Sequence, residues 1–542
     1  MNRHNATPSD LTLARARQSL KTEGVPAYYE GTDFSYEDLE PILLTEKGEK
    51  TIYEAVSPCN RCGSCSAICP SYQATRKENL SPRGRCQLIR MLKEFRLKTP
   101  AKALKEALSS CFLCGACENE CHASIPMPKI VMELRKTYLR PKPGFMRKLA
   151  LRLKLKRRII YGLWLKAGML MLKLKLPWFA KILGLPALLG VSPSELMAMK
   201  FKPRLSFGKE RLKRLSNPPK HSLKWVYFSS CETNYILPDI AEDTAELLER
   251  HAGEGMLMGN FCCGLASMRY GNDSEAMAFA KKNIIIFEKL QKKHGKFIIV
   301  TDCSSCASFL KNYEQLFVKG KKEEEIVKEN SETVRVINPD INESTDLMSY
   351  ACEEENLAGK TGEKDPLTGM ESEKTANETE SDEPDSLENW RRRAREFAGS
   401  VRDIAEVLKI SQFQKLENCA EADGRTVCWQ DSCSAAYKQQ IHDMPYSLIK
   451  HFAGRSFRDL PESMACCGGR KHNISVPQEL LDYSREKKMK NIASIQACSI
   501  IMSDPCCLIK LQSELPAWYP AAKAYHFSSY VNMTEKKHKR FN

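Results

Sequence analysis

The sequence predicts an α+β, multidomain protein in which a helical, cysteine-rich domain is followed by two copies of an α/β cysteine-rich module. Three observations lead to this prediction. Two cysteine runs near the N-terminus share one spacing, a second cysteine pattern occurs twice downstream, and apolar strand-like runs alternate with helical segments around that second pattern. At 542 residues the chain is long enough for two to four domains, each of which can bury its own core.

The two N-terminal runs both read Cys-x2-Cys-x2-Cys-x3-Cys, over 59–69 and 111–121. Thiolates at this spacing bind cubane iron-sulfur clusters, and in two-cluster ferredoxins the fourth cysteine of each run binds the other cluster. His122 follows the second run where Pro70 follows the first, so the usual proline is missing there. We therefore expect a helical ferredoxin-like domain with two [4Fe-4S] clusters, one held by Cys59, Cys62, Cys65 and Cys121 and the other by Cys111, Cys114, Cys117 and Cys69.

Zinc sites and disulfide bonds are the alternatives for these cysteines. Structural zinc takes four tetrahedral ligands, usually as two separated pairs, whereas each run here crowds four cysteines together. Disulfide frameworks suit small secreted chains, and we find no hydrophobic signal segment before residue 59. Eight of the 23 cysteines lie in the two runs and most others fall into two later groups, which favours metal chemistry in a reducing compartment.

The net charge of +16 suits nucleic acid, acidic partners or an anionic membrane surface. Lys and Arg are densest over 129–224, where they alternate with Leu, Ile, Met and Trp and form no aromatic base-stacking platform. The distribution therefore argues against nucleic acid as a partner. A basic scaffold protein with zinc-filled sites would explain the charge but not the repeated cysteine spacing.

The stretch 145–190 is apolar but carries Lys or Arg every few residues, so it cannot form a membrane-spanning helix, which needs about 18 consecutive apolar residues. Two interpretations remain. The stretch is a basic amphipathic surface that lies on anionic lipid, or its helices pack on the ferredoxin-like domain, elsewhere in the chain or on a membrane-bound partner subunit. The alternation over 151–156 favours packing, because it distributes charge around a helix.

The downstream cysteines form one pattern twice. Each copy has a single cysteine after an apolar strand-like run, a Cys-Cys-Gly at the next such junction, and further cysteines after a third strand. Helical segments such as 241–251 and 274–293 separate the strands, which predicts a parallel α/β sheet in each copy. The expected strands are 225–228 and 297–300 in the first copy, and 426–429 and 500–502 in the second.

Cysteines at three strand ends of a parallel sheet converge on one site, because ligands collect beyond the carboxyl ends of such strands. We expect one or two further iron-sulfur clusters there. The candidate ligands are Cys231, Cys262, Cys263, Cys303 and Cys306 in the first module, and Cys433, Cys466, Cys467 and Cys506 in the second. The glycines that follow the vicinal cysteines, Gly264 and Gly468, would allow the backbone to approach a cluster closely.

The two copies differ at their last cysteines. The second reads Ser503-Asp504-Pro505-Cys506-Cys507 where the first has Cys303 and Cys306, so one thiolate is replaced and Cys507 is expected to be out of register by one residue. The first module therefore has the fuller ligand set. Isolated cysteines are interpreted as small buried apolar residues: Cys86, Cys352, Cys419, Cys428 and Cys498.

An acidic segment at about 323–387 lacks hydrophobic periodicity and looks like an insertion in the first module, because 401–408 resembles the terminal segment 525–531 of the second. A linker between domains is the alternative. The expected divisions are an N-terminal extension (1–54), the ferredoxin-like domain (55–140), a basic apolar helical connector (141–221), the first module (222–417) and the second module (424–535).

With these motifs, the sequence resembles the iron-sulfur subunits of glycolate oxidase, lactate-utilisation and anaerobic glycerol-3-phosphate dehydrogenase systems, and the catalytic subunits of heterodisulfide reductases. The resemblance rests on CNRCGSCSAICPSY, SPRGRCQLIRML, CFLCGACENEC and both cysteine-rich modules. It implies two cubane clusters that feed further clusters in a cytoplasmic or membrane-peripheral complex. In heterodisulfide reductases the fuller module holds a non-cubane cluster that cleaves disulfides, and the first module matches that set.

Two functions follow as expectations. In the first, electrons from a flavoprotein dehydrogenase pass through the clusters toward a quinone or membrane redox partner, since no Gly-rich dinucleotide fingerprint lies between a strand and a helix here. In the second, a disulfide is cleaved at the first module. Arg83 and Arg85 lie between the cysteine runs and would either tune cluster potentials or simply be exposed.

Overall fold

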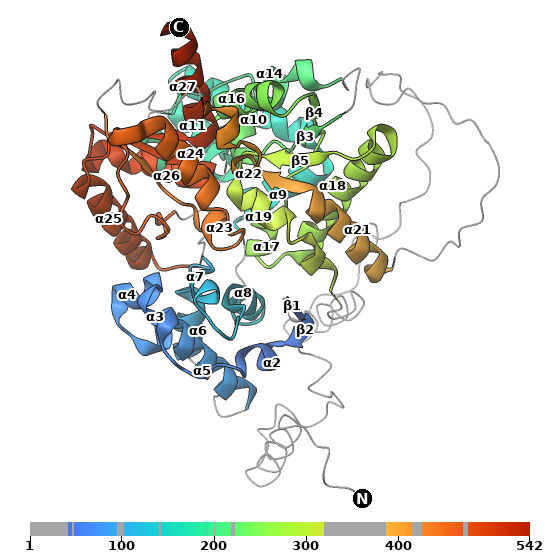
Figure 1. The fold of residues 1–542 in the computed structure, drawn as a ribbon. Coiled ribbons are helices and arrows are strands. Elements are labelled where there is room, and N and C mark those ends of the chain that lie inside the picture. The colour runs from blue at the N-terminus through green and yellow to red at the C-terminus, as the bar shows by residue number, and fades with distance from the viewer. Residues whose placement is uncertain are drawn as a thin grey trace, which may run out of the picture.

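The computed structural model is helix-rich and contains two parallel sheets, one in each cysteine-rich module (Figure 1). The residues it describes are 42–45, 48–94, 102–139, 143–189, 191, 193–199, 201–217, 223–318, 386–414, 425–469 and 475–541. Cys352 and Cys419 therefore lie outside the described residues. The predicted acidic segment also lies outside them, except for its last two residues.

The sheet of the first module has four parallel strands in the order β4-β3-β5-β6. β6 lies beyond the acidic segment in the sequence but pairs with β5, with Val401 opposite Ile299. The two central strands, β3 and β5, consist mainly of buried apolar and aromatic residues, as expected for a sheet that helices cover on both faces. Their bounds are β3 (Trp225–Tyr227), β4 (Gly255–Leu257), β5 (Ile298–Thr301) and β6 (Val401–Asp403).

The sheet of the second module has three parallel strands in the order β7-β8-β9, which correspond to β3, β5 and β6. The counterpart of β4 is reduced to a single parallel bridge between Val427 and Phe457. The strand expected before the vicinal cysteines therefore does not form in this module. The strands are β7 (Val427–Trp429), β8 (Ser499–Met502) and β9 (Lys523–His526).

Helices cover the two sheets, and the two long helical segments predicted in the first module are observed with slightly wider bounds. In the first module the helices are α15 (Cys231–Tyr235), α16 (Pro238–His251), α17 (Leu265–Arg269), α18 (Asp273–His294), α19 (Ser304–Leu310), α21 (Leu387–Ser400) and α22 (Ile404–Val407). In the second they are α23 (Cys433–Ala436), α24 (Asp443–Ala453), α25 (Gln478–Ser494), α26 (Pro505–Trp518) and α27 (Phe527–Phe541).

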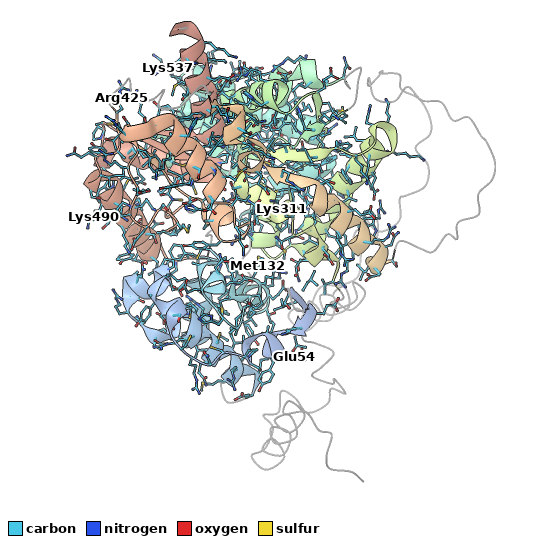
Figure 2. The ribbon with its side chains drawn as sticks, in the orientation of Figure 1. Glu54, Met132, Lys311, Arg425, Lys490 and Lys537 are labelled. Carbon is cyan, nitrogen blue, oxygen red and sulfur yellow. The ribbon has the colours of Figure 1, made fainter. Side chains whose placement is uncertain are left out.

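The ferredoxin-like part is helical and lies below the modules in Figure 1. A hairpin of β1 (Ile42–Thr45) and β2 (Gly48–Thr51) precedes it. Met132 packs against both its core and the core of the first module (Figure 2). Its helices are α2 (Ile52–Val56), α3 (Ser64–Ala67), α4 (Pro70–Thr75), α5 (Pro82–Lys93), α6 (Lys102–Ser109), α7 (Ala116–Asn119) and α8 (Met127–Tyr138).

The connector is helical as predicted, and its inner face packs on the modules. Tyr161, Leu165 and Met169 share an apolar cluster with Ile236 of the first module and Ile509 of the second. Among the described residues, this cluster includes none from the ferredoxin-like part. The connector helices are α9 (Phe145–Lys156), α10 (Arg158–Lys173), α11 (Pro177–Ile182), α12 (Leu185–Leu189), α13 (Pro193–Ala198) and α14 (Gly208–Arg211). In the described part of the chain, no helix combines the length and the apolar character needed to cross a membrane.

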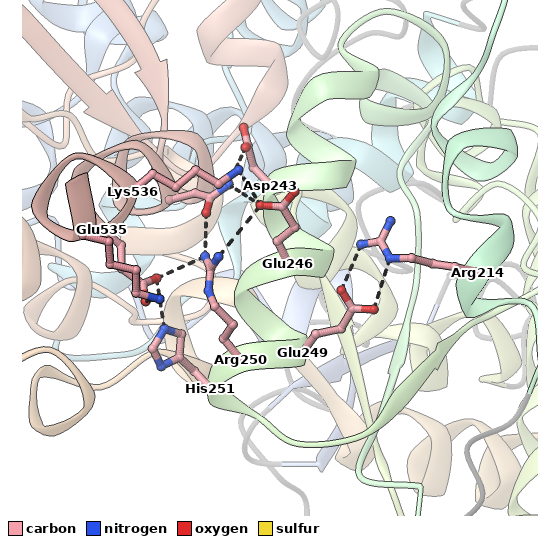
Figure 3. Close-up of polar contacts among 10 residues, drawn as sticks. Arg214, Asp243, Glu246, Glu249, Arg250, His251, Glu535 and Lys536 are labelled. Carbon is pink, nitrogen blue, oxygen red and sulfur yellow. Dashed lines mark hydrogen bonds and ion pairs between the residues drawn. The ribbon is translucent and has the colours of Figure 1, made fainter.

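The two modules exchange helix contacts reciprocally. α16 of the first packs on α27 of the second, and α24 of the second packs on α22 of the first. The sheets share one apolar cluster that includes Trp225 and Trp429. Figure 3 shows the polar edge of the α16–α27 contact, where Glu535 accepts from Arg250 at 3.1 Å and faces His251 at 3.2 Å.

Glu535→Gln is expected to lower the free energy of unfolding by about 1–2 kcal/mol, because it removes a carboxylate that faces several cationic groups. Burial alone would raise the pKa of Glu535, but hydrogen bonds with His251 and Lys539 and the charge of Arg250 outweigh it and lower the pKa below 4.5. The stabilisation is therefore complete above pH 4.5 and is lost as the pH falls through the folded-state pKa.

Urea unfolding of both forms between pH 3 and 7 measures this effect. Glu249→Gln is the matched control, because Glu249 of α16 pairs with Arg214 near the surface and such pairs contribute about 0–1 kcal/mol. Equal losses for the two variants would contradict the prediction.

Candidate metal centres

The two N-terminal cysteine runs fold into the same loop. Gly63 and Gly115 both have φ of +92° and begin α3 and α7, while Arg61 and Leu113 have φ of +60° and +53°. Left-handed conformations at residues other than glycine are strained and persist only where the surroundings enforce them. The repeated loop therefore presents both sets of thiols in the same way.

The structure brings together the two cysteine sets that the crossed pattern predicts. Burial raises the pKa of Cys65, and so do the thiolates of Cys59, Cys121 and Cys62, so the four sulfurs lie within electrostatic range. Burial likewise raises the pKa of Cys117 well above its usual value, with contributions from Cys114, Cys111 and Cys69. Each set of four thiols fits the ligand demand of one cubane cluster.

Arg85 and Arg83 have different environments. Arg85 is buried and donates to the Cys69 sulfur at 3.8 Å and to the Ser71 and Ser110 hydroxyls at 2.8 and 2.9 Å. Arg83 pairs with Glu78 at 2.6 Å on the surface. Of these two arginines, Arg85 is therefore the one that places a positive charge against a cysteine of the second set.

In the first module, the five predicted cysteines line one cavity of about 60 Å³ at the carboxyl ends of the strands. Cys306 lies 3.4 Å from Cys263 by their sulfurs, and Cys303 accepts the backbone N–H of Cys306 at the start of α19. The sulfurs of Cys303 and Cys306 and a carboxylate oxygen of Glu232 lie within 4.8 Å of one another. Five thiols exceed the four ligands of a tetrahedral zinc site and fit an iron-sulfur cluster better.

In the second module, Cys507 is the counterpart of Cys306, which corrects the register expected from the sequence. Asp504 begins α26 as Cys303 begins α19, and it accepts the backbone N–H of Cys507 three residues later. The Cys507 sulfur lies 3.2 Å from that of Cys467, just as Cys306 lies against Cys263. Cys506 aligns with Ser305, although it also lines the cavity of about 50 Å³ in this module.

In both modules the pKa of the second vicinal cysteine is lowered by hydrogen bonds from other thiols. Hydrogen bonds from Cys262 and Cys306 lower the pKa of Cys263, and hydrogen bonds from Cys466 and Cys507 lower the pKa of Cys467. Five thiols line the second cavity, and four of them have cysteine counterparts in the first module: Cys433, Cys466, Cys467 and Cys507. Four thiols are the ligand number of a cubane cluster.

Asp504 stands at the position of the missing thiolate but serves another purpose. Its carboxylate accepts the backbone N–H of Cys506 at 2.8 Å and, across the module interface, the backbone N–H of Ser305 at 2.9 Å. These contacts use both carboxylate oxygens to cap α26 and to hold α19. The substitution of Cys303 by Asp504 therefore replaces a candidate ligand with a structural group.

The two motif glycines both have positive φ values and lie close to the following helix. Gly264 has φ of +92°, and a Cβ there would lie 3.2 Å from the carbonyl oxygen of Ala276 in α18. Gly468 has φ of +71°, and its Cβ would lie 2.6 Å from the carbonyl oxygen of Leu481 in α25. Glycine therefore permits a left-handed turn against the next helix in each module.

Arg269, which was not expected from the sequence, joins the module sites. It lines the cavities of both modules, and its Nε and Nη1 atoms are buried without a hydrogen-bond partner among the described residues. Burial lowers the pKa of Arg269, while the thiolates of Cys433 and Cys111 oppose that shift. Arg269 thus places a positive charge beside three cysteine sites, where bound clusters with thiolate ligands carry negative charge.

The second cysteine set of the ferredoxin-like part lies against the second module. Asn119 donates to the carbonyl oxygen of Tyr437 at 3.0 Å, and a Cβ on Gly115 would lie 3.3 Å from that of Tyr437. Burial and the thiolate of Cys433 raise the pKa of Cys114 to about 12. A cavity of about 240 Å³ between the two parts is lined by both Cys114 and Cys466.

The isolated cysteines divide into two kinds. Cys86 and Cys428 are buried, in agreement with the sequence interpretation. Cys86 also forms a hydrogen bond with Cys59, and that bond lowers the pKa of Cys59 to about 6. Cys498 is only partly buried and lies beside the carbonyl oxygen of Gln496.

Two protein families match the chain. Residues 55–125 match the 4Fe-4S dicluster domain, and residues 225–311 and 427–512 each match the cysteine-rich domain. These ranges contain the cysteine sites described above, with Cys507 among them, and they also contain Arg269. The matches support iron-sulfur clusters rather than zinc or disulfides in these sites.

Several known proteins are similar to the chain. A probable glycolate oxidase iron-sulfur subunit of Bacillus subtilis is 22% identical over 474 residues, which cover 84% of this chain and 88% of the relative. Lactate utilization protein A of Shouchella clausii is 19% identical, covering 57% of this chain and 98% of the relative. A subunit of the dihydromethanophenazine:CoB–CoM heterodisulfide reductase of Methanosarcina barkeri is 25% identical, covering 46% and 55%.

These similarities confirm the resemblance found in the sequence. The chain contains one 4Fe-4S dicluster domain followed by two cysteine-rich domains, and it is similar to glycolate oxidase iron-sulfur subunits, to lactate utilization protein A and to a heterodisulfide reductase subunit.

Proposed function

We propose that the chain is the iron-sulfur electron-transfer subunit of a redox complex. Electrons from a flavoprotein dehydrogenase enter the ferredoxin-like domain, continue along the cysteine sites of the modules and leave toward a quinone or a membrane redox partner. The observation that carries the proposal is the contiguity of the sites, since Cys114 and Cys466 border one cavity and Arg269 borders both module cavities. The similarity to iron-sulfur subunits of glycolate oxidase supports this role.

The proposed ligands follow the observed groups. Two [4Fe-4S] clusters are assigned to Cys59, Cys62, Cys65 and Cys121 and to Cys111, Cys114, Cys117 and Cys69; a third cluster is assigned to Cys231, Cys262, Cys263, Cys303 and Cys306, and a fourth to Cys433, Cys466, Cys467 and Cys507. Bound clusters supply sites that accept and release single electrons.

Three cationic side chains lie beside these proposed ligands. Arg85, Lys154 and Arg269 place cations beside the second ferredoxin set, the first module and the junction of the two modules. Although burial alone would lower the pKa of Lys154, the thiolates of Cys231 and Cys262 and the Tyr161 hydroxyl contribute to a net increase. Such cations favour the reduced state, because reduction adds negative charge.

Metal analysis and electron paramagnetic resonance of protein prepared without oxygen test the proposal. We expect abundant iron and acid-labile sulfide, signals from the ferredoxin-like clusters after dithionite reduction, and reoxidation of the reduced protein by a quinone analogue. A colourless preparation without inorganic sulfide would contradict cluster binding. A loaded protein that no quinone analogue reoxidises would contradict the proposed acceptor but not the clusters.

Disulfide reduction at the first module is the second candidate function. Five thiols converge there, and a polypeptide of a heterodisulfide reductase is among the similar proteins. Converting one disulfide to two thiols requires two electrons and two protons, and the same cysteine route would deliver the electrons one at a time. Turnover of a disulfide by dithionite-reduced protein, abolished in Cys303→Ser, would favour this function over electron transfer to a quinone.

A further inference from the structure

The outer side of the connector exposes an apolar surface, which we call the connector face. Most large apolar side chains that are exposed in the described part of the chain belong to it. Trp178 is 65% exposed, Ile159 75% and Leu163 62%. The face consists of Phe145, Ile159, Ile160, Leu163, Leu170, Leu174, Leu176, Trp178, Phe179 and Ile182.

α10 is apolar on two opposite sides. Tyr161, Leu165 and Met169 recur at helical spacing and pack on the modules, whereas Ile159, Leu163 and Leu170 recur at the same spacing toward solvent. α11 packs beside α10 and adds Trp178 and Phe179 to the exposed side. A soluble surface helix needs only one apolar stripe, so the outer stripe indicates a binding surface.

The charge of the connector face has one sign. Residues 143–189 contain eleven Lys and Arg and no Asp or Glu. Several of these cations point inward, such as Lys154 at the first module's cavity and Lys166, which pairs with Glu210 at 2.6 Å. Six others are exposed around the apolar residues: Lys148, Arg152, Lys156, Arg157, Lys173 and Lys175.

The apolar residues and the positive charge of the connector face together indicate which kind of partner it binds. A second copy of the chain would bring two like-charged rims together in an isologous contact, which is repulsive. Insertion across the bilayer is excluded for the described helices, because none could span it. Apolar and aromatic side chains bordered by Lys and Arg suit the interface of a membrane that contains anionic lipids, where the apolar groups enter the acyl boundary and the cations meet headgroups.

We propose that the connector face binds the surface of an anionic lipid membrane, with α10 and α11 lying in the plane of the interface. In the view of Figure 1 the ferredoxin-like helices lie below the labelled connector helices α9, α10 and α11. The inference needs neither the clusters nor the proposed electron route, so the two proposals can fail independently.

Vesicle co-sedimentation of the full, cluster-loaded protein tests this proposal. We expect binding to vesicles of phosphatidylglycerol and phosphatidylethanolamine, weak binding to phosphatidylcholine alone, and release at high salt. Trp178→Ser is expected to weaken binding to the anionic vesicles about tenfold, and Lys173→Glu/Lys175→Glu by more than tenfold. Vesicles with brominated acyl chains should quench the fluorescence of Trp178.

Matched variants elsewhere on the surface are the controls. Trp518 is 42% exposed on α26, and Lys292 and Lys293 are exposed at the end of α18. Trp518→Ser and Lys292→Glu/Lys293→Glu should bind vesicles like the unaltered chain, and all variants should keep their iron and sulfide. Equal binding by Trp178→Ser and Trp518→Ser would overturn the proposal. So would failure to bind anionic vesicles, or a dimer that Trp178→Ser dissociates.

Discussion

Cys507→Ser is expected to remove the cluster of the second module, whereas Cys506→Ser is expected to retain it. The Cys507 sulfur contacts that of Cys467 and follows Asp504 by three residues, which is the placement of Cys306 in the first module. Cys506 occupies the position of Ser305, so a serine there reproduces the residue that the first module already has. Neighbouring cysteines that differ by one position thus have opposite expected roles.

Iron and sulfide counts on the two variants, with electron paramagnetic resonance of the reduced proteins, measure the difference. In Cys507→Ser the signals of the ferredoxin-like clusters and of the first module should persist while those of the second disappear. The opposite result, with Cys506→Ser losing the cluster and Cys507→Ser keeping it, would restore the ligand set expected from the sequence and would refute the helix register as a guide to ligation.

Arg269→Met is expected to lower the reduction potentials of the clusters in both modules. Each reduction adds negative charge beside the buried guanidinium, so removing that charge destabilises the reduced states. Unit charges roughly 8 Å apart interact by about 2 kcal/mol at an effective dielectric constant near 20. An interaction of that size corresponds to roughly 90 mV for a one-electron couple.

Potentiometric titration followed by electron paramagnetic resonance separates this electrostatic role from a structural one. Arg269→Lys keeps the charge and should leave the potentials nearly unchanged. Arg83→Met removes a guanidinium that pairs with Glu78 on the surface and should not alter the module potentials. Shifts of equal size in the Lys and Met variants would show that Arg269 acts through packing rather than charge.

The sequence was most informative where chemistry and spacing coincide. The shared spacing of the two cysteine runs corresponds to one loop that forms twice, at Gly63 and Gly115, and the cysteines of each expected set lie within electrostatic range of one another. The strands and long helices of the modules were predicted within a few residues, since buried apolar runs alternate with amphipathic segments. The segment 401–408, whose sequence resembles 525–531, begins with β6, and β6 pairs with β5 as β9 pairs with β8.

Other features depend on three-dimensional packing. The expectation that Cys507 is out of register is wrong, because Asp504 begins α26 as Cys303 begins α19 and this common helix start sets the correspondence. The sequence contains a signal for this correspondence, because Cys306 follows Cys303 by three residues and Cys507 follows Asp504 by the same interval. Arg269 left no comparable signal, because it becomes important only when two cavities from distant segments meet around it.

The reciprocal packing of α16 on α27 and of α24 on α22 has a consequence for how the modules unfold. Such an exchange is found between identical subunits of an isologous dimer, but here both halves belong to one polypeptide. Melting either sheet would expose the apolar surface of the other, because both contribute to the cluster around Trp225 and Trp429. We therefore expect the duplicated halves to unfold as a single cooperative unit, with one transition in heat denaturation.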